Sequence, residues 1–600
     1  MAALFFLFLY SHRVVEAHAS WGPTPEAHAW AKVEGLATQI TAARTHGQVP
    51  LALAPRKGSA SYQLSGTNYK RNATLLSVTG HDRIVRVDPV RRVIHAEAGV
   101  TMETLVRAAR EHGLVPKVVA PFREATVGGS IAASAFSSAS HRHGSFHDTC
   151  TYLTVVLGNS TIVTCSPTEY PELFQSFAGS HGTLGVVALA GVECDEAAPT
   201  VRITYTRQNS IEEGVATLKR ACKYPRPPPV PSSLPGPKEI PDSAPHFVDA
   251  VLYREKSRAV GDISRASQLT AEASFDAVGR DAAPPPVPTA APGDVGHMER
   301  VASSPLPQDS TGPTHPASLP PSLPPCPLPF YTGGRGSSDL FYSEHLEDIH
   351  ALLERSNADS YVESMDLEDY LFRYDRGVFW LAQTSAASIP VFPFLQGWYF
   401  ARGSRSFLSR VCWRWLFSSS FLFSLLHAAT PDLLASRLLL LAPCLPVNQA
   451  PALLAFLHTT LPLPPPAPLY LLPQRGSSVR QPFASHGHIH TLFLSVYVYA
   501  RLGKGEAQGH TQRVEAWVGK KGGRTGLCTM NYWDKSVFWS GYPLYDWREY
   551  VYLRHKYGAE GVFPSLEEKV CWEGEKAKSG KGWIERYWEG RRRKFLGILV

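Results

Sequence analysis

The stretch that decides the fold runs from residue 126 to residue 144 and reads TVGGSIAASAFSSASHRHG. It consists mostly of glycine, alanine and serine, and it contains no carboxylate. Because glycine has no Cβ and tolerates positive φ, such a segment lets the backbone approach a bulky ligand closely. Successive backbone N–H groups in a turn can also bind phosphate oxygens. We therefore expect residues 126–144 to contact a large anionic cofactor, and the alternative is an ordinary small-residue turn between strands.

The segments on both sides of this stretch predict regular structure. Upstream, residues 83–88 and 92–98 alternate with period two, as half-buried strands do. Thr101 then predicts the start of a helix that stops at Gly113. One face of this helix carries Met102, Leu105, Val106 and Ala109. Downstream, the sequence GNS at residues 158–160 lies between two runs of strand-forming residues and predicts a hairpin.

A second glycine-rich turn, GSHGTLGVV at residues 179–187, completes an order of parts that resembles a known superfamily. Strand, helix ending in Gly-Leu-Val-Pro, T-V-G-G loop, hairpin and G-T-L-G-V-V together resemble the FAD-binding PCMH fold of the vanillyl-alcohol oxidase type. Within it, residues 126–129, 138–144, 165–169 and 182–185 resemble the Δ24-sterol reductases of the Diminuto/seladin group. The resemblance runs from about residue 33 to residue 198 and is patchy afterwards.

The resemblance implies an α+β fold and an FAD site. In the superfamily an early loop meets the pyrophosphate, and many members bond the flavin covalently to a histidine after that loop's glycine. Ser59 and Ala60 stand there in this chain, so we expect FAD to be bound non-covalently. The residues expected to bind it are Pro55, Arg56, Lys57, Gly58, Thr126, Val127, Gly128, Gly129, Ser130, Ile131, Ala132, Ala133, Ser134, Ala135, Phe136, Ser137, Ser138, Ser140, His141, Gly144, Gly182, Gly185 and Val186.

Composition divides the rest of the chain. Residues 225–245 contain nine prolines and residues 281–330 contain fifteen, which disfavours helices and sheet ladders there. These segments are either real loops or intron sequence read through in the gene. We expect an FAD-binding PCMH-type domain followed by an α+β substrate (cap) domain that the two proline-rich segments interrupt. The predicted divisions are an apolar signal-like or anchor-like segment at 1–27, the FAD domain at 28–200, the cap domain at 201–575 and a basic tail at 576–600.

The candidate catalytic residues lie in the segment DYLFRYDRGVFW at residues 369–380. It resembles a part of the reductases that lines the cap domain, and an amphipathic strand whose Arg and Asp pair locally is the alternative. Tyr374, Asp375 and Arg376 are the candidates, and His141 is a further candidate for a proton donor.

Three other runs beyond residue 200 carry structural predictions. Residues 246–253 and 492–499 are predicted strands. The apolar run at 433–445 predicts a core helix or an apolar surface near the substrate.

The resemblance implies an oxidoreductase that reduces the C24–C25 side-chain double bond of a sterol, with NADPH as the reductant of FAD. Saturating that bond requires a hydride and a proton on adjacent carbons. Because the alkene is not conjugated, the site should be dry and aromatic, so that ring faces stabilise developing positive charge. Two alternatives remain open: an FAD-linked oxidase of an alcohol or sugar that uses oxygen, and a catalytically silent flavin-fold scaffold.

Charge and hydropathy bear on location and partners. The chain has a formal net charge of +7, and basic residues gather in the tail, which is either a solvated terminus or a contact with an anionic membrane. Residues 2–10 are apolar but too few to span a bilayer. The resemblance implies an endoplasmic reticulum membrane or membrane-associated location. We expect a sterol or other apolar small molecule as substrate, no nucleic-acid partner and, from nine cysteines without C-x-x-C spacing, no metal site.

Overall fold

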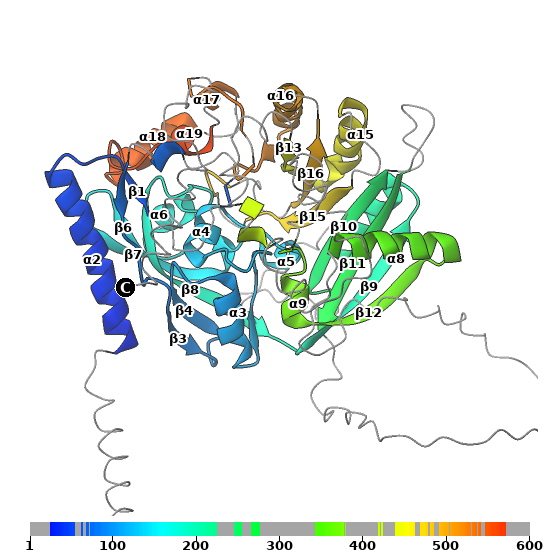
Figure 1. The fold of residues 1–600 in the computed structure, drawn as a ribbon, viewed down its shortest axis with the longest axis horizontal. Coiled ribbons are helices and arrows are strands. Elements are labelled where there is room, and N and C mark those ends of the chain that lie inside the picture. The colour runs from blue at the N-terminus through cyan, green and yellow to red at the C-terminus, as the bar shows by residue number, and fades with distance from the viewer. Residues whose placement is uncertain are drawn as a thin grey trace, which may run out of the picture.

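Helices and strands are both abundant in the computed structural model, and the predicted α+β class is confirmed. The structure describes residues 24–54, 62–63, 68–70, 73–224, 245–254, 266–275, 342–376, 379, 418–420, 422–423, 438–461, 468–477, 480–484, 491–502, 505–529, 531–536, 538–541 and 546–571. The apolar run at 2–10, the loop residues Pro55 to Gly58, the basic tail and the proline-rich segments except Pro245 lie outside these residues. Figure 1 shows two units side by side, the first in blue and cyan and the second mainly in green, yellow and orange.

The first unit is built on an antiparallel sheet with the strand order β3-β4-β8-β6-β7, and β5 pairs with β8. A separate parallel pair, β1 and β2, lies beside it. The strands are β1 Leu51–Leu53, β2 Thr74–Leu76, β3 Ile84–Asp88, β4 Val93–Glu97, β5 Leu114–Pro116, β6 Cys150–Leu157, β7 Ile162–Cys165 and β8 Gly185–Glu196. The helical elements are α2 Pro25–Thr45, η1 Asn68–Lys70, α3 Met102–Arg110, α4 Val127–Ala132, α5 Ser140–His143, η2 His147–Thr149 and α6 Pro171–Ser176.

Several of the predicted elements of this unit are confirmed. The Thr101 side chain caps α3 by accepting a hydrogen bond from the Thr104 backbone N–H at 3.2 Å, and the predicted apolar face of α3 is fully buried. Gly113 follows α3 with φ +69°, a conformation that glycine adopts without strain. The predicted hairpin is formed by β6 and β7.

The second unit is a larger antiparallel sheet with the order β12-β9-β11-β10-β15-β16-β14-β17, and β13 pairs with β16. Its strands are β9 Thr200–Gln208, β10 Phe247–Arg254, β11 Ala266–Phe275, β12 Ser360–Asp366, β13 Leu438–Leu441, β14 Pro443–Pro446, β15 Leu469–Arg475, β16 Leu492–Arg501 and β17 Arg524–Thr525. The remaining helices are α7 Ile211–Ala221, α8 Tyr342–Ser356, α9 Leu367–Leu371, η5 Val447–Gln449, α15 Ala450–Thr460, α16 Glu506–Lys520, α17 Phe538–Gly541, α18 Trp547–Lys556 and α19 Leu566–Val570.

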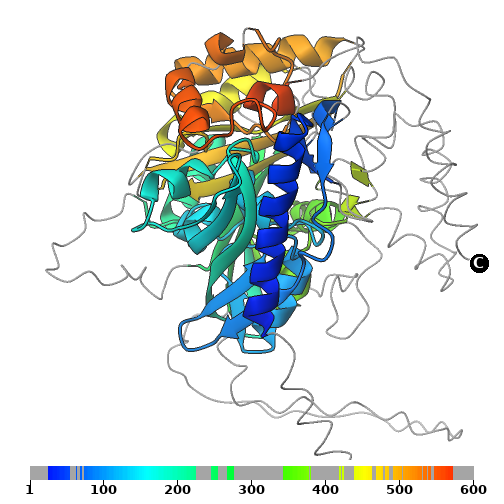
Figure 2. The same ribbon diagram turned by 90° about the vertical axis from the view of Figure 1, so that its left-hand side faces the viewer.

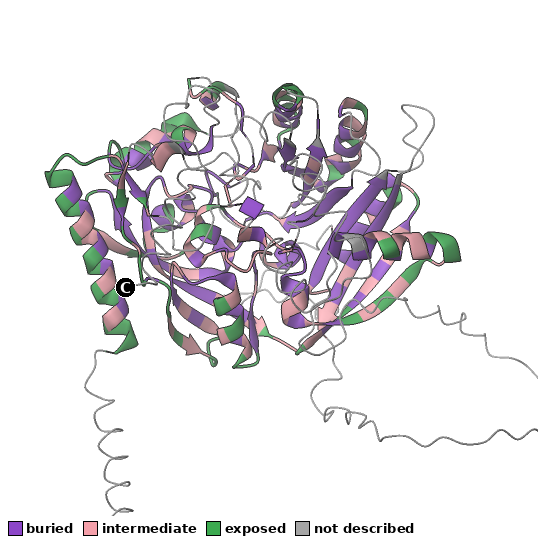
Figure 3. Cartoon of the chain, viewed as in Figure 1, coloured by how far each residue is buried: buried purple, intermediate pink, exposed green. Residues whose placement is uncertain are grey.

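Both faces of the central strands of this sheet are buried, as Figure 3 shows in purple. Successive side chains of β10 point to opposite faces of the sheet, and each set lies in a different hydrophobic core. Val248, Ala250 and Leu252 belong to a core that includes residues of α7, α15 and α16. The intervening Val251 and Tyr253 belong to the core that the second unit shares with the first. The sheet therefore presents one face to α7, α15 and α16, and the other to α8 and to the core that is shared with the first unit.

The C-terminal segment returns to the first unit. Ala559, Val562 and Phe563 pack in one core with residues of α2, and the Leu51 backbone N–H donates to the Val562 carbonyl at 2.7 Å. Figure 2 shows α2 in dark blue on the face turned to the viewer, with the red C-terminal helices beside its upper end. We predicted residues up to 575 in the second domain, whereas the structure places residues 559–563 in the core of the first unit.

At two places the structure decides between alternatives that the sequence left open. Residues 369–376 form the end of α9 and a following turn rather than an amphipathic strand, because Asp366 caps a helix there. Residues 438–446 form the strands β13 and β14, which excludes a core helix there, and Leu440 and Leu441 line a cavity, which leaves the alternative of an apolar surface. In the part of the chain that the structure describes, no helix has both the length and the apolar character needed to cross a bilayer.

Candidate functional site

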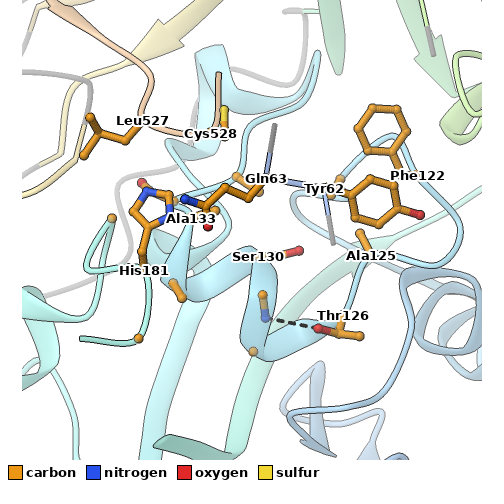
Figure 4. Close-up of a pocket in the computed structure, with 18 of the residues that line it drawn as sticks. Tyr62, Gln63, Phe122, Ala125, Thr126, Ser130, Ala133, His181, Leu527 and Cys528 are labelled. Carbon is orange, nitrogen blue, oxygen red and sulfur yellow. Dashed lines mark hydrogen bonds between the residues drawn. The ribbon is translucent and has the colours of Figure 1, made fainter. Parts of the chain in front are cut away.

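A cavity of about 780 Å³ lies where the two units meet. One side is formed by α4, β1 and the turn before β8, and the other by the α9 turn, β13, β15 and β16. Figure 4 shows part of this cavity, with Ser130 on α4 below the rings of Tyr62 and Phe122.

The TVGG segment forms a capped helical start rather than an open turn. Thr126 accepts a hydrogen bond from the Gly129 backbone N–H at 3.1 Å, which Figure 4 marks with a dashed line. The N–H groups of Val127 and Gly128 donate to the carbonyls of Val100 and Ala98 at 2.9 and 2.8 Å. The expected nest of free N–H groups is therefore wrong for Val127, Gly128 and Gly129, because the protein itself uses these donors.

The two glycines have packing roles rather than a left-handed conformation. A Cβ on Gly128 would come within 2.9 Å of the Ala98 Cβ, so only glycine allows α4 to lie this close to the segment after β4. Gly129 is exposed and lines the cavity, so a side chain there would enter the ligand space. The sequence composition thus produces a smooth wall on which a large ligand can lie.

Most of the predicted cofactor residues in the described chain line the cavity. They are Thr126, Gly128, Gly129, Ser130, Ala132, Ala133, Ser134, Ala135, Phe136, Ser137, Ser138, Gly182, Gly185 and Val186. Val127 and Ile131 point into the hydrophobic core instead. Pro55, Arg56, Lys57 and Gly58 lie outside the described residues, so their role stays a prediction.

Ser140, His141 and Gly144 do not line the cavity, because the end of the loop packs against the second unit. The His141 ring nitrogens lie 2.9 Å from the Ser138 carbonyl and 3.1 Å from the Pro245 carbonyl. Burial lowers the pKa of His141 to about 3, so the ring is neutral and a poor candidate for a proton donor near neutral pH. Gly144 has φ +81°, and a Cβ there would come within 2.6 Å of the Asp148 carboxylate.

One end of the cavity is cationic. Lys569 of α19 lines it, and its Nζ donates to the carbonyls of His181 and Gly182 at 2.8 and 3.0 Å. Lys70 of η1 also lines it, and both ammonium groups lie within 6 Å of the Tyr69 ring centroid, at 5.8 Å for Lys70 and 5.4 Å for Lys569. Lysines on a shared wall suit an anionic ligand.

The opposite end is aromatic. Tyr62 stacks on Phe122 with the ring centroids 4.9 Å apart. Phe379 stacks on Tyr374 at 4.4 Å, and its ring lies 6.2 Å from that of Tyr497. A smooth small-residue wall, cations at one end and flat rings at the other fit FAD, which combines a diphosphate with an aromatic ring system. The described residues are therefore compatible with that cofactor.

A buried ion pair supports the aromatic end. Arg373 donates to the Asp249 carboxylate at 2.5 Å, and both side chains are only 4% exposed. Tyr470 also donates to Asp249, at 3.0 Å, and the Arg373 guanidinium lies 3.8 Å from the centroid of the Tyr370 ring. Because Arg373 also lies 3.3 Å from the Ser138 hydroxyl, this network joins β10, β15 and α9 to the small-residue loop.

Of the three predicted catalytic residues, only Tyr374 lines the cavity. Asp375 is buried behind it and accepts hydrogen bonds from the Arg123 backbone N–H at 2.9 Å and the Ser419 hydroxyl at 2.6 Å. Burial raises the pKa of Asp375 above its ordinary value. Arg376 is not among the lining residues either, so the structure does not bring the three together at one surface.

Sequence reasoning missed several lining residues, namely Tyr62, Gln63, Phe122, Arg373, Phe379, Tyr470, Tyr497, Tyr499, Cys528 and Lys569. For Tyr497 and Tyr499 a signal existed, because their spacing of two places both on one face of the predicted strand at 492–499. Lys569 gave no such signal, since its contact with residues 181 and 182 arises only in the folded chain.

Comparison with known proteins agrees with this geometry. Residues 29–166 match the family described as FAD binding domain. The chain carries an FAD-binding domain. It is 26% identical to the Delta(24)-sterol reductase of Homo sapiens over 181 residues, which are 30% of this chain and 35% of that protein.

Two further relatives show how wide the similarity is. The chain is 26% identical to the Delta(24)-sterol reductase of Pisum sativum over 212 residues, which are 35% of this chain and 36% of the relative. It is 32% identical to Cytokinin dehydrogenase 8 of Oryza sativa subsp. indica over 123 residues, which are 20% and 23% of the two chains. The matched regions thus span about a third or less of these relatives.

Proposed function

We propose that the protein reduces the C24–C25 double bond of a sterol side chain, with NADPH as the source of electrons. The observation that carries this proposal is the aromatic end of the cavity, which adjoins the small-residue wall of α4. An isolated alkene offers no polar group for recognition, so a site for it must rely on apolar burial and on ring faces. The similarity to proteins named Delta(24)-sterol reductase supports the same substrate class.

The reaction requires a hydride on one alkene carbon and a proton on the other, and NADPH is oxidised to NADP⁺. FAD, when bound, supplies the hydride after its own reduction by NADPH. The chain's own residues must hold the apolar substrate, exclude water and provide the proton. Tyr62, Phe122 and Phe379 supply ring surface for the first two tasks.

Tyr374 is the residue that we assign to hold the proton. It lines the cavity, whereas Asp375, Arg376 and His141 do not. Burial and the nearby Asp249 raise the pKa of the Tyr374 phenol well above its ordinary value, so the phenol stays protonated across the physiological range. A proton released from it to the substrate would be replaced from solvent after product leaves.

The test is to incubate the full chain with NADPH and desmosterol, a sterol with a Δ24 double bond, and to look for the saturated side chain by mass spectrometry. The expected result is formation of the saturated product that requires both the protein and NADPH. Stoichiometric FAD in the purified protein without any product, in detergent and in membranes, would contradict the proposal.

A dehydrogenase or oxidase is the second candidate, because the similarity to a protein named Cytokinin dehydrogenase 8 reaches 32% over its matched region. The electron donor in that case is an alcohol or a sugar. Anaerobic mixing with NADPH separates the two candidates. Bleaching of the flavin by NADPH followed by slow reaction with air favours the reductase, whereas fast hydrogen peroxide production from an added donor favours the oxidase. A protein without flavin absorbance would instead support a silent scaffold.

A further inference from the structure

Lys569 is a buried lysine at the cationic end of the cavity, held there by the backbone of another part of the chain. Its Nζ donates to the carbonyls of His181 and Gly182, and both of these residues are left-handed, with φ +51° and +68°. The next carbonyl, that of Thr183, accepts from Arg554 of α18 at 2.7 Å. The turn before β8 is therefore fixed from the C-terminal side by the side chains of Lys569 and Arg554.

The electrostatic surroundings of Lys569 disfavour its charged form. Burial, Lys70 on η1 and Arg554 on α18 all lower the pKa of Lys569, to about 7. Of the other titratable groups that face it, His181 is neutral and Tyr69 is protonated near this pH, since burial lowers the pKa of His181 to about 4 and raises that of Tyr69 to about 12. The pKa of Lys70 is lowered by burial as well. At pH 8 most Lys569 amines are therefore neutral in the protein without cofactor.

An anion at this end of the cavity would reverse that balance, because an opposite charge nearby favours the ammonium form. The diphosphate is the charged part of oxidised FAD, whereas its ring system and ribityl chain are neutral. We infer that Lys569 is a binding residue for the FAD diphosphate and that it takes up a proton when the cofactor binds. The inference requires FAD binding, but it requires neither a sterol nor the reduction of a double bond.

The sign of the pH dependence follows from linkage. Below pH 7 Lys569 already carries its proton, so the affinity for FAD is nearly independent of pH. Above pH 7 the proton has to be taken from solvent on binding, so the affinity falls by up to roughly tenfold per pH unit until the pKa of the bound form is reached. Burial also lowers the pKa of Lys70, so a Lys70 variant has to be tested beside the Lys569 variants.

The experiment uses the full chain after its FAD has been removed. FAD is titrated calorimetrically at pH 8 and at pH 6 in two buffers with different ionisation enthalpies, which gives the number of protons taken up. The expected result is about one proton per FAD at pH 8 and about none at pH 6. Riboflavin, which has the ring but no phosphate, should bind without proton uptake at pH 8.

Variants identify the group that takes up the proton. Lys569→Met should bind FAD weakly, with no proton uptake and a flat pH dependence, and Lys569→Arg should bind FAD without proton uptake because its charge is permanent. If the methionine variant does not fold, the arginine variant carries the test. Lys520→Met, at the exposed end of α16, is the matched control and should behave like the parent.

Three results would overturn the inference. The first is FAD binding by the parent at pH 8 without proton uptake. The second is undiminished uptake in both Lys569 variants, or loss of uptake only in Lys70→Met. The third is uptake that appears only when NADPH is added to the FAD-loaded protein, since the anion at Lys569 would then be a phosphate of NADPH.

Discussion

The two ends of the cavity are built in opposite ways. Along α4 the wall is made of backbone and of side chains no larger than serine and alanine, and its shape depends on close approach, as at Gly128 and Ala98. At the aromatic end the wall is made of large rings, and a buried polar network around Asp249 and Arg373 holds them. The first wall can be damaged only by adding atoms, whereas the second is damaged by removing them.

The largest expected effect is on the backbone-built wall. Gly129→Arg places a long cationic side chain in the ligand space, so we expect less than about a tenth of the parent's FAD content, consistent with the steric cost of filling a close-packed site. The absorbance ratio of flavin to polypeptide measures this. Gly35→Arg, on the exposed side of α2 with nothing within 4 Å of its Cβ, is the control and should retain FAD. A flavin-bound Gly129→Arg protein would show that the ligand does not lie against α4.

The next effect concerns the network that supports the rings. Asp249→Asn leaves the buried Arg373 charge without its carboxylate, which typically destabilises a protein by about 3–5 kcal/mol. Chemical denaturation of parent and variant measures the change. Asp348→Asn, on the exposed face of α8, should leave the stability unchanged within about 0.5 kcal/mol. Equal stability of the two variants would mean that the ion pair does not hold the aromatic wall.

A smaller structural change tests whether the Tyr374 hydroxyl donates the proton to the substrate. Tyr374→Phe keeps the ring but removes the hydroxyl, so we expect folded, FAD-bound protein whose flavin is reduced by NADPH at the parent rate. Transfer to the alkene should slow by about 100-fold or more, the usual contribution of a positioned acid. Stopped-flow reoxidation of the reduced flavin by substrate separates the two half-reactions. Parent-like reoxidation would remove Tyr374 from the mechanism.

The smallest effect is expected at Arg376. We predicted it as a catalytic residue from sequence, but it does not line the cavity. Arg376→Ala should therefore impair substrate turnover much less than Tyr374→Phe, and steady-state rates of the two variants side by side provide the measurement. A loss at Arg376 as large as that at Tyr374 would restore the sequence-based assignment.

The two walls of the cavity differ in how much of their structure could be predicted from the sequence. Local patterns are sufficient for α3, for the β6–β7 hairpin and for the strands β10 and β16, because caps, turn residues and alternation act over a few residues. The same patterns indicate that residues 126–138 line a ligand site. They do not indicate that Thr126 starts a helix whose first donors are used by Ala98 and Val100, since those carbonyls come from a different part of the chain.

Most of the aromatic wall could not be predicted from local sequence patterns. Its rings come from residues as far apart as Tyr62, Phe379 and Tyr497, and only folding of the two sheets against each other brings them together. Asp249 looks from sequence like a polar residue on a strand, yet its place opposite Arg373 decides its role. Lys569 is the extreme case, because both its partners lie almost 400 residues earlier in the chain.

The return of the C-terminal segment has a consequence for how the protein is made. Ala559, Val562 and Phe563 complete the core under α2, and Leu51 pairs with the Val562 carbonyl. A nascent chain that has emerged from the ribosome only to residue 200 therefore lacks part of the hydrophobic interior of its own first unit. We expect capture of the yellow coenzyme to follow the end of translation, and a premature stop codon before residue 559 to yield a product that cannot retain it.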